Sequence, residues 1–83
     1  MKGSVAHINQ QRGMVAVETE DGDYSIIELL GDEVEVGDEL QWRSDHPLGS
    51  ETIRNISQGV NMEVYFQNHC VSRQQLRQQL LYQ

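Results

Sequence analysis

The segment MVAVETEDGDYSIIELL, residues 14–30, decides the fold. Two runs rich in β-branched and aromatic residues, 14–20 and 24–30, flank the pair Asp21-Gly22. An Asp-Gly pair between two such runs predicts a tight hairpin, because glycine adopts the positive φ that the turn requires. The segment therefore predicts two antiparallel strands, and it makes an all-β domain the expected fold class.

More short strands are expected on both sides of this hairpin. A first strand fits residues 3–9, another lies around Leu40 and Trp42, and another runs over residues 51–56. Turn residues, such as the Pro47 that fixes φ, separate them. Short strands at close intervals with turn signals between them are typical of a small β-barrel or sandwich.

The pattern changes in the last third of the chain. Residues 60–67, VNMEVYFQ, alternate between apolar and polar, which predicts a sixth, half-buried strand. From Ser72 onward the spacing becomes helical, because Leu76 and Leu80 lie one turn apart and Ser72 fits an N-cap. We therefore expect a short C-terminal helix with a narrow apolar stripe.

The net charge of -7 is unevenly distributed. Residues 18–39 hold ten of the 13 acidic residues and none of the six Lys and Arg, so the rest of the chain, with three acids and six bases, carries +3. Acidic residues in turns keep a small β-protein soluble and discourage pairing of strand edges. The charge therefore disfavours a polyanionic ligand only along the acidic stretch, because local potential decides phosphate binding.

The length of 83 residues predicts one domain, 1–83, with a barrel core over 1–58 and a strand and helix extension over 59–83. A chain of this size buries roughly 60% of the surface that its unfolded form exposes, so no deep catalytic cavity is expected and the protein is predicted not to be an enzyme. No apolar run reaches the roughly 18 residues of a membrane span and no secretory signal is evident, so we expect a soluble, cytoplasmic protein.

No cofactor or metal site is expected. The three histidines, His7, His46 and His69, do not have the spacing of a zinc site, and Cys70 is the single cysteine. One cysteine cannot form an internal disulfide, and no neighbouring signal marks Cys70 as an activated nucleophile.

The order of motifs over residues 3–56 resembles the cold-shock domain, a five-stranded oligonucleotide-binding (OB) barrel. The matching motifs, in chain order, are Gly3-Ser4-Val5, Asn9, Arg12-Gly13, Val36-Gly37-Asp38, Trp42, Gly49 and Asn55-Ile56. The resemblance implies a small OB-fold with an added C-terminal strand and short helix, and an SH3-like barrel is the alternative.

The chain departs from the family at the positions that stack bases. His7 stands at the tryptophan position of the first strand, Met14 and Ala16 replace two aromatic residues of the second, and the third-strand positions fall at about Ser25 and Ile27. Stacking contributes roughly 1–3 kcal/mol per base. Tight binding of the cold-shock type is therefore not expected.

The sequence predicts a non-enzymatic binding module for RNA or single-stranded DNA, with weak or shape-based binding through the barrel face. The candidate contact residues are Lys2, His7, Asn9, Arg12, Met14, Arg43 and Arg54. The alternative is a module for a protein partner or a second copy of the chain, whose former ligand face is apolar or covered by the C-terminal extension. The candidate residues for that alternative are Met14, Ile27, Leu76, Leu80, Arg73 and Arg77.

The alternative predicts a role for the leucines of the extension. If Leu76 and Leu80 pack against the barrel or against a second copy, replacing both by serine lowers the free energy of unfolding or shifts the oligomeric state, because serine removes their apolar surface. Urea denaturation and sedimentation check this expectation. A double variant with unaltered stability, oligomeric state and partner binding would contradict it.

Overall fold

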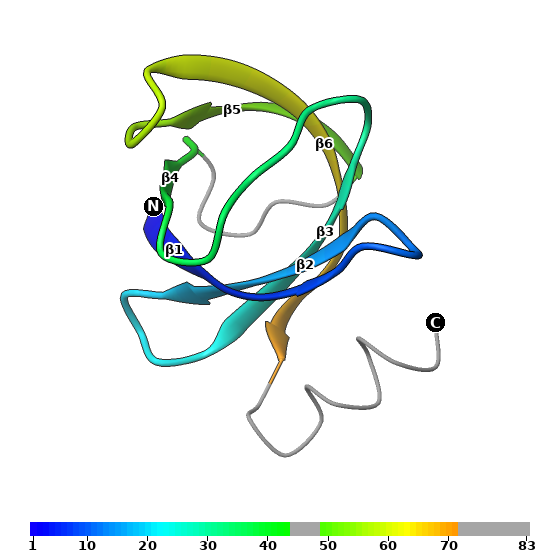
Figure 1. Ribbon diagram of the computed structural model, residues 1–83. Coiled ribbons are helices and arrows are strands. Elements are labelled where there is room, and N and C mark those ends of the chain that lie inside the picture. Colours follow the sequence, from blue (N-terminus) through cyan, green and yellow to red (C-terminus); the bar gives the residue numbers. More distant parts are fainter. Residues whose placement is uncertain (44–48, 72–83) are drawn as a thin grey trace.

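The structure, a computed structural model, describes residues 1–43 and 49–71 and contains six strands and no helix within them (Figure 1). The strands are β1 Lys2–Asn9, β2 Met14–Thr19, β3 Tyr24–Leu29, β4 Glu39–Gln41, β5 Gly49–Asn55 and β6 Val60–Val71. The expected all-β class and the six strands are confirmed. The helix expected from Ser72 lies outside the described residues.

All neighbouring strands are antiparallel, in the order β1-β2-β3-β6-β5-β4. Because β4 also pairs with β1, the sheet closes on itself and its strands surround a common interior (Figure 1). β6 lies between β3 and β5. The segment expected as an extension thus supplies a strand with a neighbour on each side.

The predicted hairpin of residues 14–30 is present as β2 and β3. The turn is closed by the Thr19 amide, which donates to the Asp23 carbonyl at 2.8 Å. Gly22 has a φ of 86°, the left-handed conformation that the Asp-Gly pair predicts. Because the turn ends at Asp23, the third strand starts with Tyr24 opposite Glu18.

One row of apolar side chains crosses four strands inside the closed sheet. Register places Ile8 opposite Val15, Val15 opposite Ile27, and Ile27 opposite Phe66. The last three are buried, and Trp42 packs on Phe66 with ring centroids 5.4 Å apart. Each such side chain contributes about 1.5–3 kcal/mol through burial, so this row is a main element of the core.

The alternation predicted for the sixth strand is confirmed in β6. Met62, Val64 and Phe66 are buried, and the polar residues between them are exposed. Val60, at the beginning of the strand, is 43% exposed. The apolar face of residues 60–67 therefore packs inside the closed sheet, except at its first residue.

A buried polar network holds the loop before β4 against the turn after β5. Asp38 Oδ2 accepts hydrogen bonds from Asn55 Nδ2 at 2.9 Å and from Gln58 Nε2 at 2.8 Å. It also accepts from the Glu35 amide at 3.0 Å. The Asp38 carbonyl accepts from the Val5 amide at 2.9 Å, so β1 joins the same network.

Gly3 occupies a position in β1 with no room for a side chain. A Cβ built there would lie 2.7 Å from the Glu18 carbonyl oxygen and 2.7 Å from Val17 Cγ1. We expect Gly3→Ala to lower the free energy of unfolding by about 1–3 kcal/mol, because β2 must move to relieve this overlap. Urea denaturation measures the change.

The neighbouring Ser4→Ala serves as control, with an expected change within about 0.5 kcal/mol because Ser4 is only partly buried and pairs with the exposed Glu39. Equal stability of Gly3→Ala and the parent chain would show that the approach of β2 to Gly3 does not constrain the sheet.

Candidate nucleic-acid interface

The outer face of β1, β2 and β3 is where the resemblance implies ligand contacts. Its centre is a second apolar cluster, separate from the interior core and formed by Met14, Ala16, Tyr24 and Ile26. Each of these side chains is at most 5% exposed, although all four point away from the interior. The centre of this face therefore offers no open surface on which a base can stack.

The third-strand stacking positions expected at Ser25 and Ile27 are wrong by one residue. Ser25 pairs with the inward-facing Val17, and Ile27 belongs to the interior core. A shift of one residue reverses the face of every side chain in a strand, so Tyr24 and Ile26 occupy the outward positions. Ile27, an expected partner contact, is fully buried in the core and cannot reach a partner from there.

Sequence reasoning missed Tyr24 as an outward aromatic residue. Its ring centroid lies 6.5 Å from that of His7, the exposed residue at the family's first-strand tryptophan position. The length of the Asp-Gly turn could have predicted this orientation. The residue after the turn, Tyr24, pairs with Glu18, whose side chain lies on the outer face. Tyr24 is 3% exposed, however, so it contributes packing at this face.

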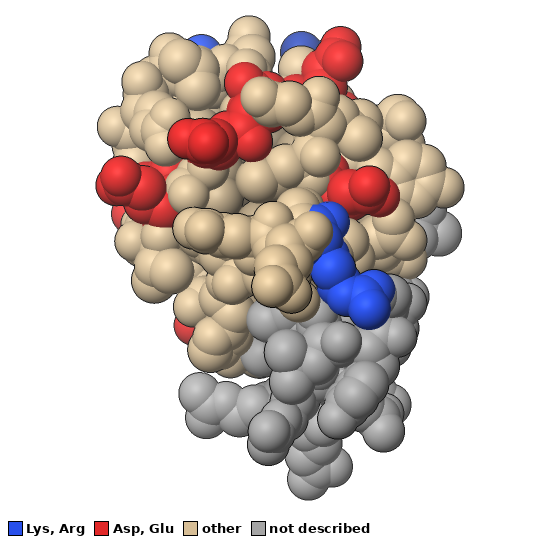
Figure 2. Space-filling view, turned by 45° about the vertical axis from the view of Figure 1, so that its right-hand side comes forward, with Lys and Arg blue, Asp and Glu red and all other residues tan. Residues whose placement is uncertain are grey.

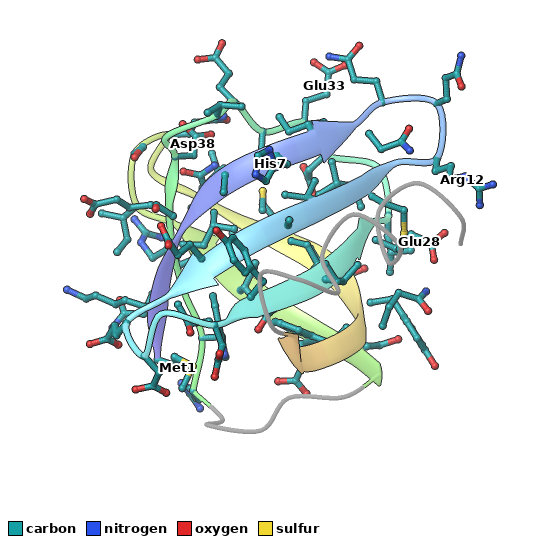
Figure 3. All side chains as sticks on the ribbon, turned by 90° about the horizontal axis from the view of Figure 1, so that it is seen from below. Met1, His7, Arg12, Glu28, Glu33 and Asp38 are labelled. Carbon is teal, nitrogen blue, oxygen red and sulfur yellow. The ribbon has the colours of Figure 1, made fainter. Side chains whose placement is uncertain are left out.

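Four candidate residues, His7, Asn9, Arg12 and Met14, lie on or beside this outer face. Register places Asn9 opposite Met14 and Met14 opposite Glu28. Arg12 shares a surface hollow with Met14 and Glu28, and Figure 3 shows Arg12 and Glu28 on the same side of the molecule. The Glu28 carboxylate opposes a phosphate at this place, because like charges repel.

The other three candidates, Lys2, Arg43 and Arg54, lie along a different wall. Register aligns Lys2 with Gln41, Gln41 with Arg54, and Arg54 with Asn61, so one outward row crosses β1, β4, β5 and β6. Arg54 Nη1 donates to Asn61 Oδ1 at 3.2 Å. We call this row, together with Arg43, the polar row.

Lys2 stands at the acidic end of the polar row. It lines a hollow together with Glu18, Glu20 and Glu39, and its backbone amide donates to Glu20 Oε1 at 2.8 Å. Arg43 and Arg54 share a different hollow, whose described lining contains no carboxylate. The structure thus separates the seven predicted contacts into two groups, and the hollow of the two arginines is the one without an acidic residue in its described lining.

Acidic side chains predominate over much of the surface. On the face in Figure 2, acidic side chains are spread over the upper part of the molecule, two basic side chains show at its upper edge, and one extended basic side chain lies right of centre beside an acidic one. A polyanion approaching that face meets like charge, which lowers its local concentration and its rate of association.

Asp38 is a structural carboxylate. Its pKa lies below the ordinary value of 3.8, because the Asn55 side chain, the Glu35 amide and the Gln58 side chain all donate to it. A general acid at neutral pH needs a raised pKa, which is the opposite displacement. The Asp38 carboxylate is therefore suited to holding the fold and unsuited to donating a proton.

Two other classes of site are absent from the residues whose side chains the structure describes, 1–43 and 49–67. No group of three or more His, Cys, Asp and Glu side chains there has an arrangement that could hold a metal ion. No helix in that part of the chain is long and apolar enough to cross a membrane. The candidates outside the described residues are Arg73, Leu76, Arg77 and Leu80.

Comparisons with known proteins add no relative. No family model, no curated protein and no solved structure matches the chain. The likeness to the cold-shock domain therefore rests on the motifs in residues 3–56 alone.

The lowered pKa of Asp38 predicts an acid-dependent loss of stability. A carboxyl whose pKa falls on folding stabilises the folded state fully above its unfolded pKa, near 3.8, and loses that contribution as pH falls through the lower folded value. The difference in free energy of unfolding between the parent chain and Asp38→Asn should therefore be largest above about pH 5 and shrink below pH 3.8.

Urea denaturation at several pH values measures this difference. Glu39→Gln, which removes one carboxylate from the adjoining exposed residue, controls for the change in net charge. A difference for Asp38→Asn that stays constant from pH 7 to pH 2 would contradict the assignment of the network.

Proposed function

We propose that the protein is a non-enzymatic module that binds RNA or single-stranded DNA weakly, through phosphate contacts from Arg43 and Arg54. The observation that carries this proposal is the hollow shared by these two arginines, which has no carboxylate in its described lining. The outer face of β1–β3 is not the place of binding in this proposal, because its apolar centre is buried and leaves no stacking surface.

Phosphate contacts suit the chemistry of this wall. Guanidinium groups donate paired, charge-assisted hydrogen bonds to phosphate oxygens, and such contacts position a strand without reading its bases. The side-chain amides of Gln41 and Asn61 lie in the same outward row and add neutral donors. We therefore expect little sequence preference and a strong dependence on salt.

The strand order supports an OB-type fold over an SH3-like one. After the β1-β2-β3 meander, the chain crosses to place β4 beside β1, and the last strand, β6, returns beside β3. Such a crossing connection is of the Greek-key kind that OB barrels use. We propose that this chain is a six-stranded variant of that barrel.

The protein-interaction alternative expects an outer face that is apolar or covered, and the buried apolar cluster of Met14, Ala16, Tyr24 and Ile26 fits that expectation. Of its candidate contacts, Met14 is 5% exposed and Ile27 is fully buried. The other four lie beyond residue 71, outside the described part of the chain.

Titration of labelled single-stranded RNA and DNA at two salt concentrations tests the proposal. We expect binding at low salt that weakens at high salt, and a loss of about five- to tenfold in affinity for Arg43→Ala and for Arg54→Ala. Each variant should also lower the slope of log K against log salt by roughly 0.7, the value for one phosphate of a single strand.

Arg12→Ala is the matched control, because it removes the same charge from the other side of the molecule, beside Glu28. Its affinity should stay within about twofold of the parent chain. Absence of binding at low salt, or equal losses for Arg12→Ala and Arg54→Ala, would overturn the proposal.

A further inference from the structure

The hollow beside the polar row differs in composition from three other hollows around the described part of the sheet. Its volume is about 520 Å³, and its described lining is Met1, Gln41, Trp42, Arg43, Arg54 and Asn61. Each of three other hollows contains at least one Asp or Glu. Among its described lining residues, this hollow thus holds two of the six Lys and Arg side chains of the chain and no Asp or Glu.

The side chains that line this hollow carry several hydrogen-bond donors. Asn61 Oδ1 accepts from Arg54 Nη1, which fixes the amide so that Nδ2 is left as a donor. The same contact restricts the Arg54 side chain, so less rotamer entropy is lost when it binds a ligand. Gln41 pairs with Arg54 in register and brings a second amide to the same wall.

Rigid structure supports the floor of the hollow. The Trp42 ring is 3% exposed and packs on Phe66 with its ring plane tilted by 57°. The Trp42 amide donates to the Met1 carbonyl at 2.9 Å, which holds the residue before Arg43 to the residue before β1. Arg43 therefore follows a residue that is held by packing and by a backbone hydrogen bond, as in ligand sites that are largely formed before binding.

We propose that this hollow binds a single phosphate group of the monoester type. A monoester carries a charge of about -1.5 to -2 at pH 7 and three terminal oxygens, which two guanidinium groups and two amides can satisfy. An internal phosphodiester has one charge and two such oxygens, so it leaves part of the donor set unused. The hollow therefore favours free phosphate or the terminal phosphate of an oligonucleotide, and the second of these rests on the proposed function.

Trp42 provides a direct readout, because it is the single tryptophan of the chain and lines the hollow. Inorganic phosphate, titrated against chloride at constant ionic strength, should give a saturable change in Trp42 fluorescence. Arg54→Ala should raise the Kd at least tenfold, and Arg54→Lys, which keeps the charge without the paired donors, should raise it less. Arg12→Ala should leave the Kd within twofold.

A second titration compares a short oligonucleotide with and without a 5′-phosphate. We expect the phosphorylated form to bind at least fivefold more tightly, and this difference should disappear in Arg54→Ala. A Trp42 signal that does not respond to phosphate, or that responds equally in Arg54→Ala, overturns the inference.

The two proposals fail in different ways. Oligonucleotide binding that depends on Arg54 but not on a terminal phosphate, with no Trp42 response to inorganic phosphate, overturns the phosphate site and supports the proposed function. A saturable, Arg54-dependent phosphate response without any oligonucleotide binding supports the anion site and overturns the proposed function.

Discussion

The hydrogen bond between the Asp38 carboxylate and the buried amide of Asn55 is the interaction on which the closed sheet depends. β4 has only three residues, Glu39–Gln41, at the short end of the usual strand lengths, and it shares three paired positions with β1 and two with β5. Asp38 precedes β4 and Asn55 ends β5, so their contact ties the start of β4 to β5, and the Asp38 carbonyl, which accepts from the Val5 amide, ties it to β1. A buried amide without its partner costs about 1–3 kcal/mol, so the two residues act as one unit.

The contact between Asp38 and Asn55 joins two of the motifs on which the resemblance to the cold-shock domain rests. The Val36-Gly37-Asp38 turn and Asn55 are among the motifs that carry the likeness, and the structure joins them by a hydrogen bond of 2.9 Å. Gly3, from another of these motifs, allows the close approach of β2. These motifs thus serve the framework, whereas the face on which such a framework would display aromatic residues holds Met14 and Ala16 in an apolar cluster.

Local patterns predicted the six strands, because the alternation in residues 60–67 and the Asp-Gly turn depend on neighbours in sequence. The prediction of which third-strand side chains point outward was wrong, because it depends on the residue at which the turn ends. A shift of one residue turns the side chains of Ser25 and Ile27 to the interior. The grouping of Arg43 and Arg54 with Asn61 was beyond prediction, since it requires the order of strands in the closed sheet. The positions of Lys and Arg in the sequence predicted which basic residues could contact a phosphate. They did not predict that these residues lie on two different sides of the sheet.

The shortness of β4 also sets where the sheet opens. β1 and β4 share three paired positions and β4 and β5 two, whereas β5 and β6 share seven. We therefore expect the local unfolding of lowest free energy to separate β4 from β1 and β5. The meander β1-β2-β3 and the hairpin β5-β6 stay paired in this process. Arg43 follows β4, and Arg54 lies on β5, the strand that pairs with β4. A ligand that bridges the two arginines therefore stabilises the pairing of β4 with β5.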